Sequence, residues 1–415
     1  MGVATDLAQR RPLWRSRLLL LGPAFVAAVA YVDPGNVAAN LTAGARYGYR
    51  LVWVLVLANV MAVVVQYQSA KLGLVTGRSL PELLGERLRT RHRRLYWVQA
   101  EAVAAATDLA EVIGGAVALH LLFGLPLLAG GVIVGIASML LLAVQSIHGQ
   151  RHFERAVITL LAVIAVGFIT GLVVAPPDVG AALGGLLPRL ENTDTVLLAV
   201  SMIGATVMPH AIYLHSALAR DRHGHATGPG ELTRLIRVTR VDVVSALVLA
   251  GAVNIGMLLL AATSLRGTEG TDTIEGAHAA ITTALGPVVG VIFAVGLLAS
   301  GLASTSVGCY AGATIMGGLL HLRVPLLTRR LLTLIPALII LGAGLEPTRA
   351  LVISQVLLSF GIPFALIPLI RLTSDAAVMG EHVDTPRLKA AGWTIAGVIT
   401  ALNVVLITLT VTGTT

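Results

Sequence analysis

Two apolar segments of the sequence are interrupted near their centres by a proline that stands beside polar residues. The first contains VDPGN, with Asp33 and Asn36, and the second contains VMPH, with Met208 and His210. Proline removes a backbone N–H and clashes with the preceding helical turn, so both helices should break at these points. In a membrane, backbone groups freed by a break must face protein or a wet cavity. The two breaks therefore form a candidate ion-binding site.

The residue types at the two breaks favour a particular class of ion. We expect Asp33 to contribute a carboxylate, Asn36 an amide oxygen and Met208 a thioether. The ends of the two first half-helices add the backbone carbonyls of Ala30 and Ala205. A thioether is a soft ligand that adds affinity for Mn, Fe, Co or Cd but almost none for Ca or Mg. The set therefore favours a transition-metal ion over Na⁺ or an amino acid.

Carboxylates in apolar surroundings are the second unusual feature. A carboxylate near the middle of a membrane span costs about 3 kcal/mol, so Asp33 needs a function or a partner. The segment QAEAVAAATDLAEVIGG adds Glu101, Asp108 and Glu111 without any lysine or arginine. Asp108 and Glu111 are three residues apart and therefore adjacent on a helix. These acids could pass protons, and His210 is a further candidate for proton handling.

Other polar residues of the apolar segments have simpler interpretations. Gln66 and Gln355 could hold neighbouring helices together, and Gln355 could also reach the ion. His215 is expected to be a buried histidine with its hydrogen bonds satisfied. Arg329 and Arg330 begin an apolar segment, so anchoring at the membrane interface is the simpler interpretation for both.

The composition decides the class of protein. Of 415 residues, 56% are hydrophobic and 12% are charged, which is about half the charged fraction of a soluble domain. The aliphatic content excludes a disordered chain. At about 20 residues per span, the length allows ten to twelve transmembrane helices. We predict eleven spans, at residues 18–46, 49–74, 95–123, 126–147, 154–175, 194–219, 236–262, 285–319, 325–345, 348–371 and 389–412.

The positive charges indicate how the chain is oriented. With these spans, 24 of the 29 lysines and arginines fall on one side of the membrane. The positive-inside rule then predicts a cytoplasmic N-terminus and, with an odd number of spans, an external C-terminus in the cell membrane. Because the net charge of +8 is explained in this way, we expect the lipid bilayer and no nucleic acid as a partner.

The positions of the breaks indicate an internal symmetry. Five spans separate them, so the second broken helix runs opposite to the first, as in an inverted repeat with a site near the midplane. We therefore predict an all-α polytopic membrane protein with a cytoplasmic segment at 1–17, repeats at 18–175 and 194–371, and a peripheral span at 389–412. No GxGxxG, GxxxxGK[ST], GxSxG, CxxC or HExxH motif occurs, so we expect a transporter driven by an ion gradient rather than an enzyme, with no cofactor.

From about Leu20 to the last span, the sequence resembles the natural resistance-associated macrophage protein (NRAMP) family of divalent-metal transporters, in its bacterial manganese-uptake branch. The motifs that carry the resemblance are DPGN, MPH, ATDLAE, ASTSVGCYAG and SQVLLSFGIPFALIPL. The resemblance implies the LeuT fold, with spans 1–5 and 6–10 as inverted repeats, discontinuous helices 1 and 6, and an eleventh span. It also implies proton-coupled uptake of Mn²⁺ or Fe²⁺ by alternating access, with no obligatory protein partner.

The resemblance also implies roles for individual residues. The implied metal ligands are Asp33, Asn36, Met208, the carbonyls of Ala30 and Ala205, and in some states Gln355. The implied proton route involves Asp33, Asp108, Glu111, His210, Arg329 and Arg330. Two alternatives stay open on the sequence alone. One is a sodium-coupled carrier of organic solutes with the same fold, and the other is an intramembrane metalloenzyme.

Overall fold

The computed structural model describes residues 22–224, 229–271, 273–322 and 324–412, which are mainly helical and contain no strand. The predicted N-terminal segment 1–17 lies outside them. The first helices are α2 (Pro23–Val29), η1 (Ala30–Val32), α3 (Pro34–Tyr47), η2 (Gly48–Leu51), α4 (Val52–Thr76), α5 (Leu80–Arg87), α6 (Thr90–Phe123), α7 (Leu127–His148) and α8 (Gln150–Val174). The others are α9 (Val179–Gly184), α10 (Thr193–Thr206), α11 (Pro209–His223), α12 (Pro229–Ser264), α13 (Ile274–Leu285), α14 (Pro287–Leu320), α15 (Leu326–Gly342), α16 (Pro347–Thr373), α17 (Ala376–Met379), η3 (Gly380–His382) and α18 (Pro386–Val411).

Most of these helices could cross a membrane. Among the described residues, eight helices or helix pairs are long and apolar enough, and nine if the bent pair Leu357–Thr373 and Ala376–His382 is one span. Each of the eleven predicted ranges contains a helix or a broken helix, but some are too short to count alone. The first half of the first predicted span, Pro23–Val32, is a short apolar helix. Helix α15 is also short, with 17 residues. The division into two repeats stays a prediction.

Both predicted breaks are present. The first span runs through α2 and η1, is extended at Asp33 (φ −68°, ψ 165°), and resumes at Pro34 as α3. The other broken span ends α10 at Thr206, is extended at Met208 (φ −77°, ψ 120°), and resumes at Pro209 as α11. Proline is well suited to the first position of a helix, because its missing N–H would have no partner there. The same prolines that break the spans therefore start the second half-helices.

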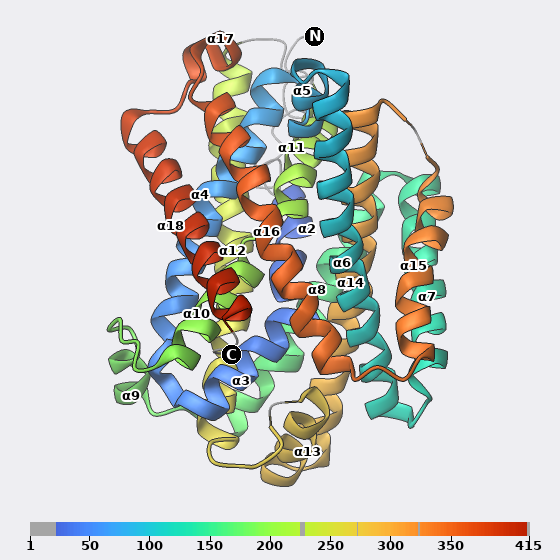
Figure 1. Ribbon diagram of the computed structural model, residues 1–415, viewed down its shortest axis with the longest axis vertical. Helices are drawn as coiled ribbons and strands as arrows, with labels where there is room; N and C mark the ends of the chain where they lie inside the picture. The colour runs from blue at the N-terminus through green and yellow to red at the C-terminus, as the bar shows by residue number, and fades with distance from the viewer. Residues whose placement is uncertain (1–21, 225–228, 272, 323, 413–415) are drawn as a thin grey trace, which may run out of the picture.

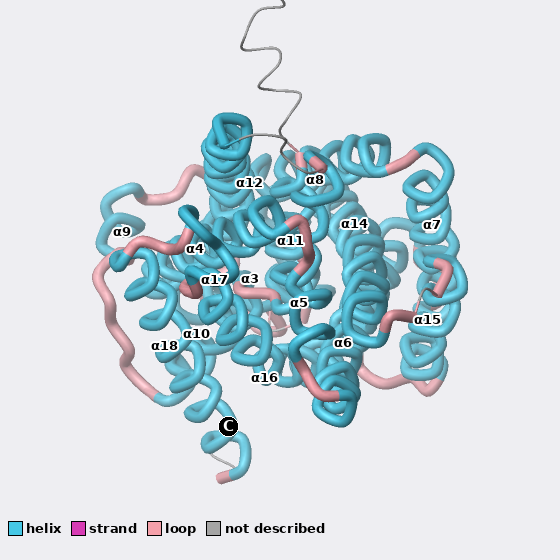
Figure 2. The backbone as a smooth tube through the Cα atoms, turned by 90° about the horizontal axis from the view of Figure 1, so that it is seen from above, coloured by secondary structure: helices cyan, strands magenta, loops and turns pink. Residues whose placement is uncertain are grey.

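The broken spans lie inside the bundle. Figure 1 shows α2 near the middle of the molecule beside α11, α3 below them beside α10, and α18 and α15 toward opposite edges. In the view from above, α11 lies near the centre, and α5, α14 and α12 are among the helices around it (Figure 2). The residues at the two breaks are consequently buried by the surrounding helices, and Asp33, Asn36 and Met208 have no exposed surface.

Glycine determines how closely α6 approaches the first break. A Cβ added to Gly114 would collide with the ring of Pro34. On the same helix, the backbone of Gly115 lies close to α14, since a Cβ added to Gly301 would be 2.8 Å from it. Such close approach is typical of membrane helices that pack through small residues. The first break is thus seated directly on α6, the helix that carries Asp108 and Glu111.

Candidate metal-ion site

The two breaks meet through the side chain of Asn36. Its Nδ2 donates to Asp33 Oδ1 at 2.5 Å and to the carbonyl oxygen of Ala205 at 3.1 Å. The hydroxyl of Thr206 donates to Asn36 Oδ1 at 3.4 Å. Three of the predicted ligands, from two spans that are about 170 residues apart in the sequence, are therefore in one hydrogen-bonded group. Carboxylate, amide and carbonyl groups together are a set that binds divalent cations.

Asp33 is a buried carboxylate at the start of a helix. It caps α3 by accepting hydrogen bonds from the backbone N–H groups of Gly35 at 3.3 Å and Asn36 at 3.0 Å. The positive end of the α3 dipole stabilises this negative charge. Among the described residues, Asp33 has no ion pair with a lysine, arginine or histidine. A carboxylate that is buried without a cationic partner is chemically suited to a cation that arrives from outside the protein.

The other predicted ligands lie on the same two breaks or against them. Ala30 is the first residue of η1, and Met208 directly precedes α11, three residues after Ala205. Gln355 of α16 approaches the first break, because a Cβ added to Gly35 would collide with its amide group. The same added Cβ would lie 3.0 Å from Asp33 Oδ2, so Gln355 is next to the Asp33 carboxylate. α16 thus joins the two broken spans at the candidate site.

The arginines of α15 correct one expectation. Arg329 and Arg330 are 3% and 0% exposed, so interfacial anchoring is wrong for both. Arg330 Nη1 donates to Asp108 Oδ1 and Oδ2 at 2.5 and 2.6 Å, and Arg329 Nη2 donates to Glu101 at 2.6 Å. The sequence suggested acids without a cationic partner in their own helix, but α15 supplies both partners. The physical reason is that a buried charge needs compensation, which can come from any neighbouring helix.

Further polar groups form hydrogen bonds with the Asp108–Arg330 ion pair. Arg330 Nε donates to the hydroxyl of Ser138 on α7 at 2.7 Å, and the Thr305 hydroxyl on α14 donates to Asp108. Four helices (α6, α7, α14 and α15) therefore contribute to one charged cluster. Because Arg330 and Asp108 are both buried, this cluster joins the consecutive helices α6 and α7 to the consecutive helices α14 and α15, which lie far away in the sequence.

Two of the residues predicted to handle protons stay without partners in the described part of the chain. Neither carboxylate oxygen of Glu111 has a hydrogen bond there, and neither ring nitrogen of His210 has one. Both side chains are buried. Glu111 lies against α14, where a Cβ added to Gly308 would be 2.9 Å from one of its oxygens. Buried titratable groups with unused hydrogen-bonding capacity are candidates for carrying a proton.

Gln66 and His215 belong to a chain of hydrogen bonds that reaches Tyr31, in the helix η1 that ends at the first break. Gln66 donates to the Tyr31 hydroxyl at 2.7 Å, and His215 Nδ1 is 2.7 Å from Gln66 Oε1. These contacts join α4 to η1 and α11, so the expectation that Gln66 links helices is confirmed. Tyr31 was not a candidate, because a tyrosine within an apolar segment has no distinguishing pattern.

Asn254 of α12 and Ser300 of α14 are two more polar residues at the first break that the sequence does not single out. Asn254 Nδ2 donates to the carbonyl of Tyr31 at 2.7 Å, and the Ser300 hydroxyl donates to the carbonyl of Val32 at 2.5 Å. The only signal in the sequence is a polar side chain in an apolar helix, which many residues share.

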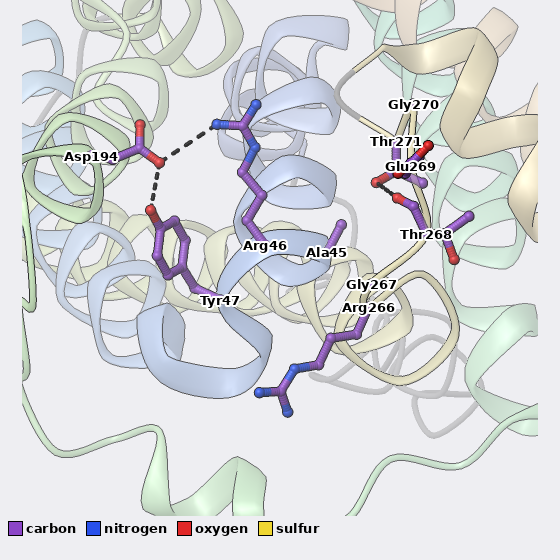
Figure 3. A pocket seen from close by; sticks show the side chains of 10 residues that line it. All are labelled: Ala45, Arg46, Tyr47, Asp194, Arg266, Gly267, Thr268, Glu269, Gly270 and Thr271. Carbon is purple, nitrogen blue, oxygen red and sulfur yellow. Dashed lines mark hydrogen bonds and ion pairs between the residues drawn. The ribbon is translucent and has the colours of Figure 1, made fainter.

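A separate pocket lies at the face where α3 ends and α10 begins. It has a volume of about 730 Å³ and is lined by residues of α3, α10 and the loop after α12, which are Ala45, Arg46, Tyr47, Asp194, Arg266, Gly267, Thr268, Glu269, Gly270 and Thr271. Figure 3 shows Arg46 and Tyr47 pointing toward Asp194. The Tyr47 hydroxyl donates to Asp194 at 2.5 Å, and Arg46 is 3.5 Å from it. Since arginines line it beside the acids, this pocket is a poor candidate for the metal site.

Comparison with known proteins shows the family to which the chain is similar. Residues 24–409 match the family described as natural resistance-associated macrophage protein-like. The chain is 59% identical over 409 residues to the divalent metal cation transporter MntH of Mycobacterium tuberculosis, which covers 98% of this chain and 96% of that relative. Both the alternative of a metalloenzyme and that of an organic-solute carrier are disfavoured by this similarity.

Solved structures agree with the fold. The manganese transporter of Eremococcus coleocola matches with a TM-score of 0.87 and 32% identity, over 95% of this chain and 87% of that chain. Mhp1, a nucleobase-cation-symport-1 family transporter, matches with a TM-score of 0.60 and 15% identity, over 94% of this chain and 89% of that one, which shows the fold alone. The predicted LeuT-like fold is thus confirmed, in a multi-pass membrane protein that is a transporter and not an enzyme. From this similarity over nearly its whole length, the chain belongs to the natural resistance-associated macrophage protein-like family of metal-ion transporters.

Proposed function

We propose that this protein imports Mn²⁺ or Fe²⁺ together with protons across the cell membrane by alternating access. The observation that carries the proposal is the contact of Asn36 with both the Asp33 carboxylate and the Ala205 carbonyl, which brings ligands of the two broken spans together. The names of the relatives support it, since one is a divalent metal cation transporter and a similar solved structure is a manganese transporter. The proposal requires no cofactor and no protein partner.

The proposed metal ligands divide into hard and soft groups. Asp33 and Asn36 supply side-chain oxygens, and Ala30 and Ala205 supply backbone carbonyls. Met208 supplies the single sulfur, and Gln355 adds an amide in some states. Oxygen ligands alone would accept Ca²⁺ or Mg²⁺, so the thioether is the group that favours Mn²⁺ and Fe²⁺ over these abundant ions.

The proposed proton route begins at the metal site. Asp33 is buried beside α6, and the two unpartnered groups, Glu111 and His210, belong to α6 and to the start of α11. Asp108 and Arg330 follow as a buried pair, with Arg329 on the same turn of α15. In this proposal a proton bound on Asp33 or Glu111 passes toward the charged cluster.

Alternating access requires that contacts of the half-helices break on one face of the membrane while those on the other face remain. Asp242 of α12 accepts hydrogen bonds from the N–H groups of Gly22 and Ala24, both at 3.0 Å, and so holds the start of α2. Arg220, at the end of α11, pairs with Glu82 of α5. In this proposal the contacts of Asp242 and Arg220 belong to the cytoplasmic face, which we assign from its excess of lysine and arginine, and the contacts of Asp194 belong to the external face.

Transport by purified protein in liposomes tests the proposal. We expect Mn²⁺ to enter the liposomes with acidification inside, faster at low external pH, and uptake to be abolished by Asp33→Ala. Asp178→Ala is the control, because Asp178 is an exposed aspartate at the start of α9. Unchanged uptake in Asp33→Ala would contradict the site, and uptake that depends on Na⁺ without acidification would contradict proton coupling.

A further inference from the structure

At the end of η1, as at the end of any broken membrane helix, backbone carbonyls lack hydrogen-bond donors within the helix. In a 3₁₀ helix, where hydrogen bonds join residues three apart, the last three carbonyls have no partner within the helix, and no water is available in the apolar interior. Here the helix ends just before Asp33, so the carbonyls of Ala30, Tyr31 and Val32 face this problem. A metal ion can use such a carbonyl as a ligand, but only if the carbonyl is free and directed at the ion.

Two buried side chains from different helices satisfy two of these carbonyls. The Asn254 amide on α12 donates to Tyr31, and the Ser300 hydroxyl on α14 donates to Val32. Asn254 is 2% exposed and Ser300 is 0% exposed. Asn40 of α3 donates to Asn254 Oδ1 at 3.0 Å, which fixes the Asn254 amide with its NH₂ toward Tyr31. Among the described residues, no side chain donates to the Ala30 carbonyl.

These contacts also constrain the residue that follows them. Because a peptide unit is planar, holding the Val32 carbonyl holds the whole plane that contains the Asp33 N–H. In the same way, a hydrogen bond to the Tyr31 carbonyl fixes the preceding peptide plane, which joins Tyr31 to Val32. The two peptide planes that lead into Asp33 are consequently fixed from α14 and α12, while the Asp33 carboxylate is fixed from the other side by the start of α3.

We propose that Asn254 and Ser300 are positioning residues for metal binding: they occupy the carbonyls of Tyr31 and Val32, so that the Ala30 carbonyl is the one left for the ion and the Asp33 carboxylate is held in the direction that binds it. This inference rests on the proposed function of Asp33 and Ala30 as ligands. Neither Asn254 nor Ser300 touches the ion in this proposal. Each acts through the backbone of the residues that do.

Ser300→Ala tests the proposal, with Ser304→Ala as the matched control. Ser304 lies one turn further on α14, is equally buried, and its hydroxyl has no hydrogen-bond partner in the described part of the chain. Removal of a group that orients a metal ligand typically costs 10–100-fold in affinity. By calorimetric titration with MnCl₂ we expect Ser300→Ala to weaken binding by about tenfold, Ser304→Ala by less than about twofold, and Ser300→Thr, which keeps the hydroxyl, to restore binding.

Transport kinetics separate positioning from loss of folded protein. In liposomes, Ser300→Ala should raise the KM for Mn²⁺ and leave the maximal rate per folded molecule nearly unchanged, whereas a merely destabilised variant would lower the maximal rate at constant KM. If Ser300→Ala does not fold, Asn254→Ala removes the other contact and has the same expected result.

The outcomes distinguish the two levels of the proposal. Equal affinities and KM values for Ser300→Ala, Ser304→Ala and the wild type would overturn the positioning role while leaving the proposed function intact. A wild type that neither binds nor transports Mn²⁺ would overturn the proposed function and the positioning role together.

Discussion

Asp33 and Asp108 are both aspartates buried inside the helical bundle, but their surroundings differ. Asp33 accepts hydrogen bonds from two backbone N–H groups and the Asn36 amide, and it has no cationic partner among the described residues. Asp108 accepts two hydrogen bonds from Arg330 and a third from Thr305. Because a buried charge must be compensated, Asp108 is compensated within the protein, and Asp33 is the aspartate that we propose as a ligand for a cation. Pairing, rather than burial, therefore separates the candidate metal ligand from the framework.

The comparison also explains why both regions touch α6. The break that carries Asp33 is seated on Gly114, and the charged cluster is built on Asp108 of the same helix. Glu111 lies between these positions in the sequence and has no partner of its own in the described part of the chain. One helix thus connects the proposed metal-ion site with a cluster in which an aspartate is paired with an arginine.

The largest expected effect comes from breaking the pair in the charged cluster. Arg330→Met leaves Asp108 buried without compensation and should lower the free energy of unfolding by about 3 kcal/mol or more. Thermal unfolding in detergent measures the loss. Asp33→Asn is the matched comparison: since Asp33 has no cationic partner to lose, this variant should unfold at or above the wild-type temperature.

The double variant Arg330→Met/Asp108→Asn sharpens this test. It removes both charges, so it should recover much of the stability that Arg330→Met loses. Equal stability of Arg330→Met and the wild type would show that the pair is not what compensates Asp108. A large loss of stability in Asp33→Asn would show that Asp33 belongs to the framework after all.

A smaller effect is expected from the sulfur at the second break. Met208→Ala should retain part of the Mn²⁺ uptake, but Ca²⁺ or Mg²⁺ should compete with Mn²⁺ about tenfold more effectively, since oxygen ligands alone do not exclude hard cations. Met202→Ala is the control, because Met202 is equally buried but lies within the regular part of α10, one turn before the break. Competition assays on uptake measure the change. Unaltered competition in Met208→Ala would refute the role of the thioether.

The breaks, and the polar residues that lie at them, could be predicted from the sequence because their signals are local. Pro34 and Pro209 end helices through their own rings, and Asp33, Asn36 and Met208 stand within three residues of them. The chemistry of a site made of adjacent residues is visible before the fold is known. The LeuT-like fold itself was implied by the family resemblance, whereas the odd number of spans between the two breaks predicted only an inverted repeat.

The partners of the acids on α6 could not be predicted, for the opposite reason. Arg330 is 222 residues from Asp108 in the sequence, and only the packing of α15 against α6 brings them together. At the end of an apolar segment, an arginine that faces the interior has the same pattern as one that anchors at the interface. Asn254 and Ser300 were missed likewise, because their acceptors are backbone carbonyls exposed only by a break in another helix.

The smallest expected effect concerns a carboxylate outside the membrane spans, which extends the comparison to a partly exposed acid. Burial alone would raise the pKa of Glu82, but hydrogen bonds from the Ser79 N–H and from Arg220 bring the pKa below its ordinary value. The ionised form is therefore the one that stabilises the fold. Its contribution is present above the ordinary glutamate pKa of about 4.3 and is lost as the pH falls through the lower pKa of the folded state.

Glu82→Gln should consequently reduce stability at neutral pH and have progressively less effect in acid. Because the Glu82 side chain is 37% exposed, solvent screening limits the loss to below about 1 kcal/mol. Thermal unfolding of Glu82→Gln and the wild type, measured from pH 7 to pH 3, should give two curves that converge at the acid end. Glu86→Gln is the control, since Glu86 lies on the same short helix and pairs only with the exposed Arg78. A Glu82→Gln deficit that stayed constant across this range would mean that the Glu82 charge contributes nothing, and that shape alone joins α5 to α11.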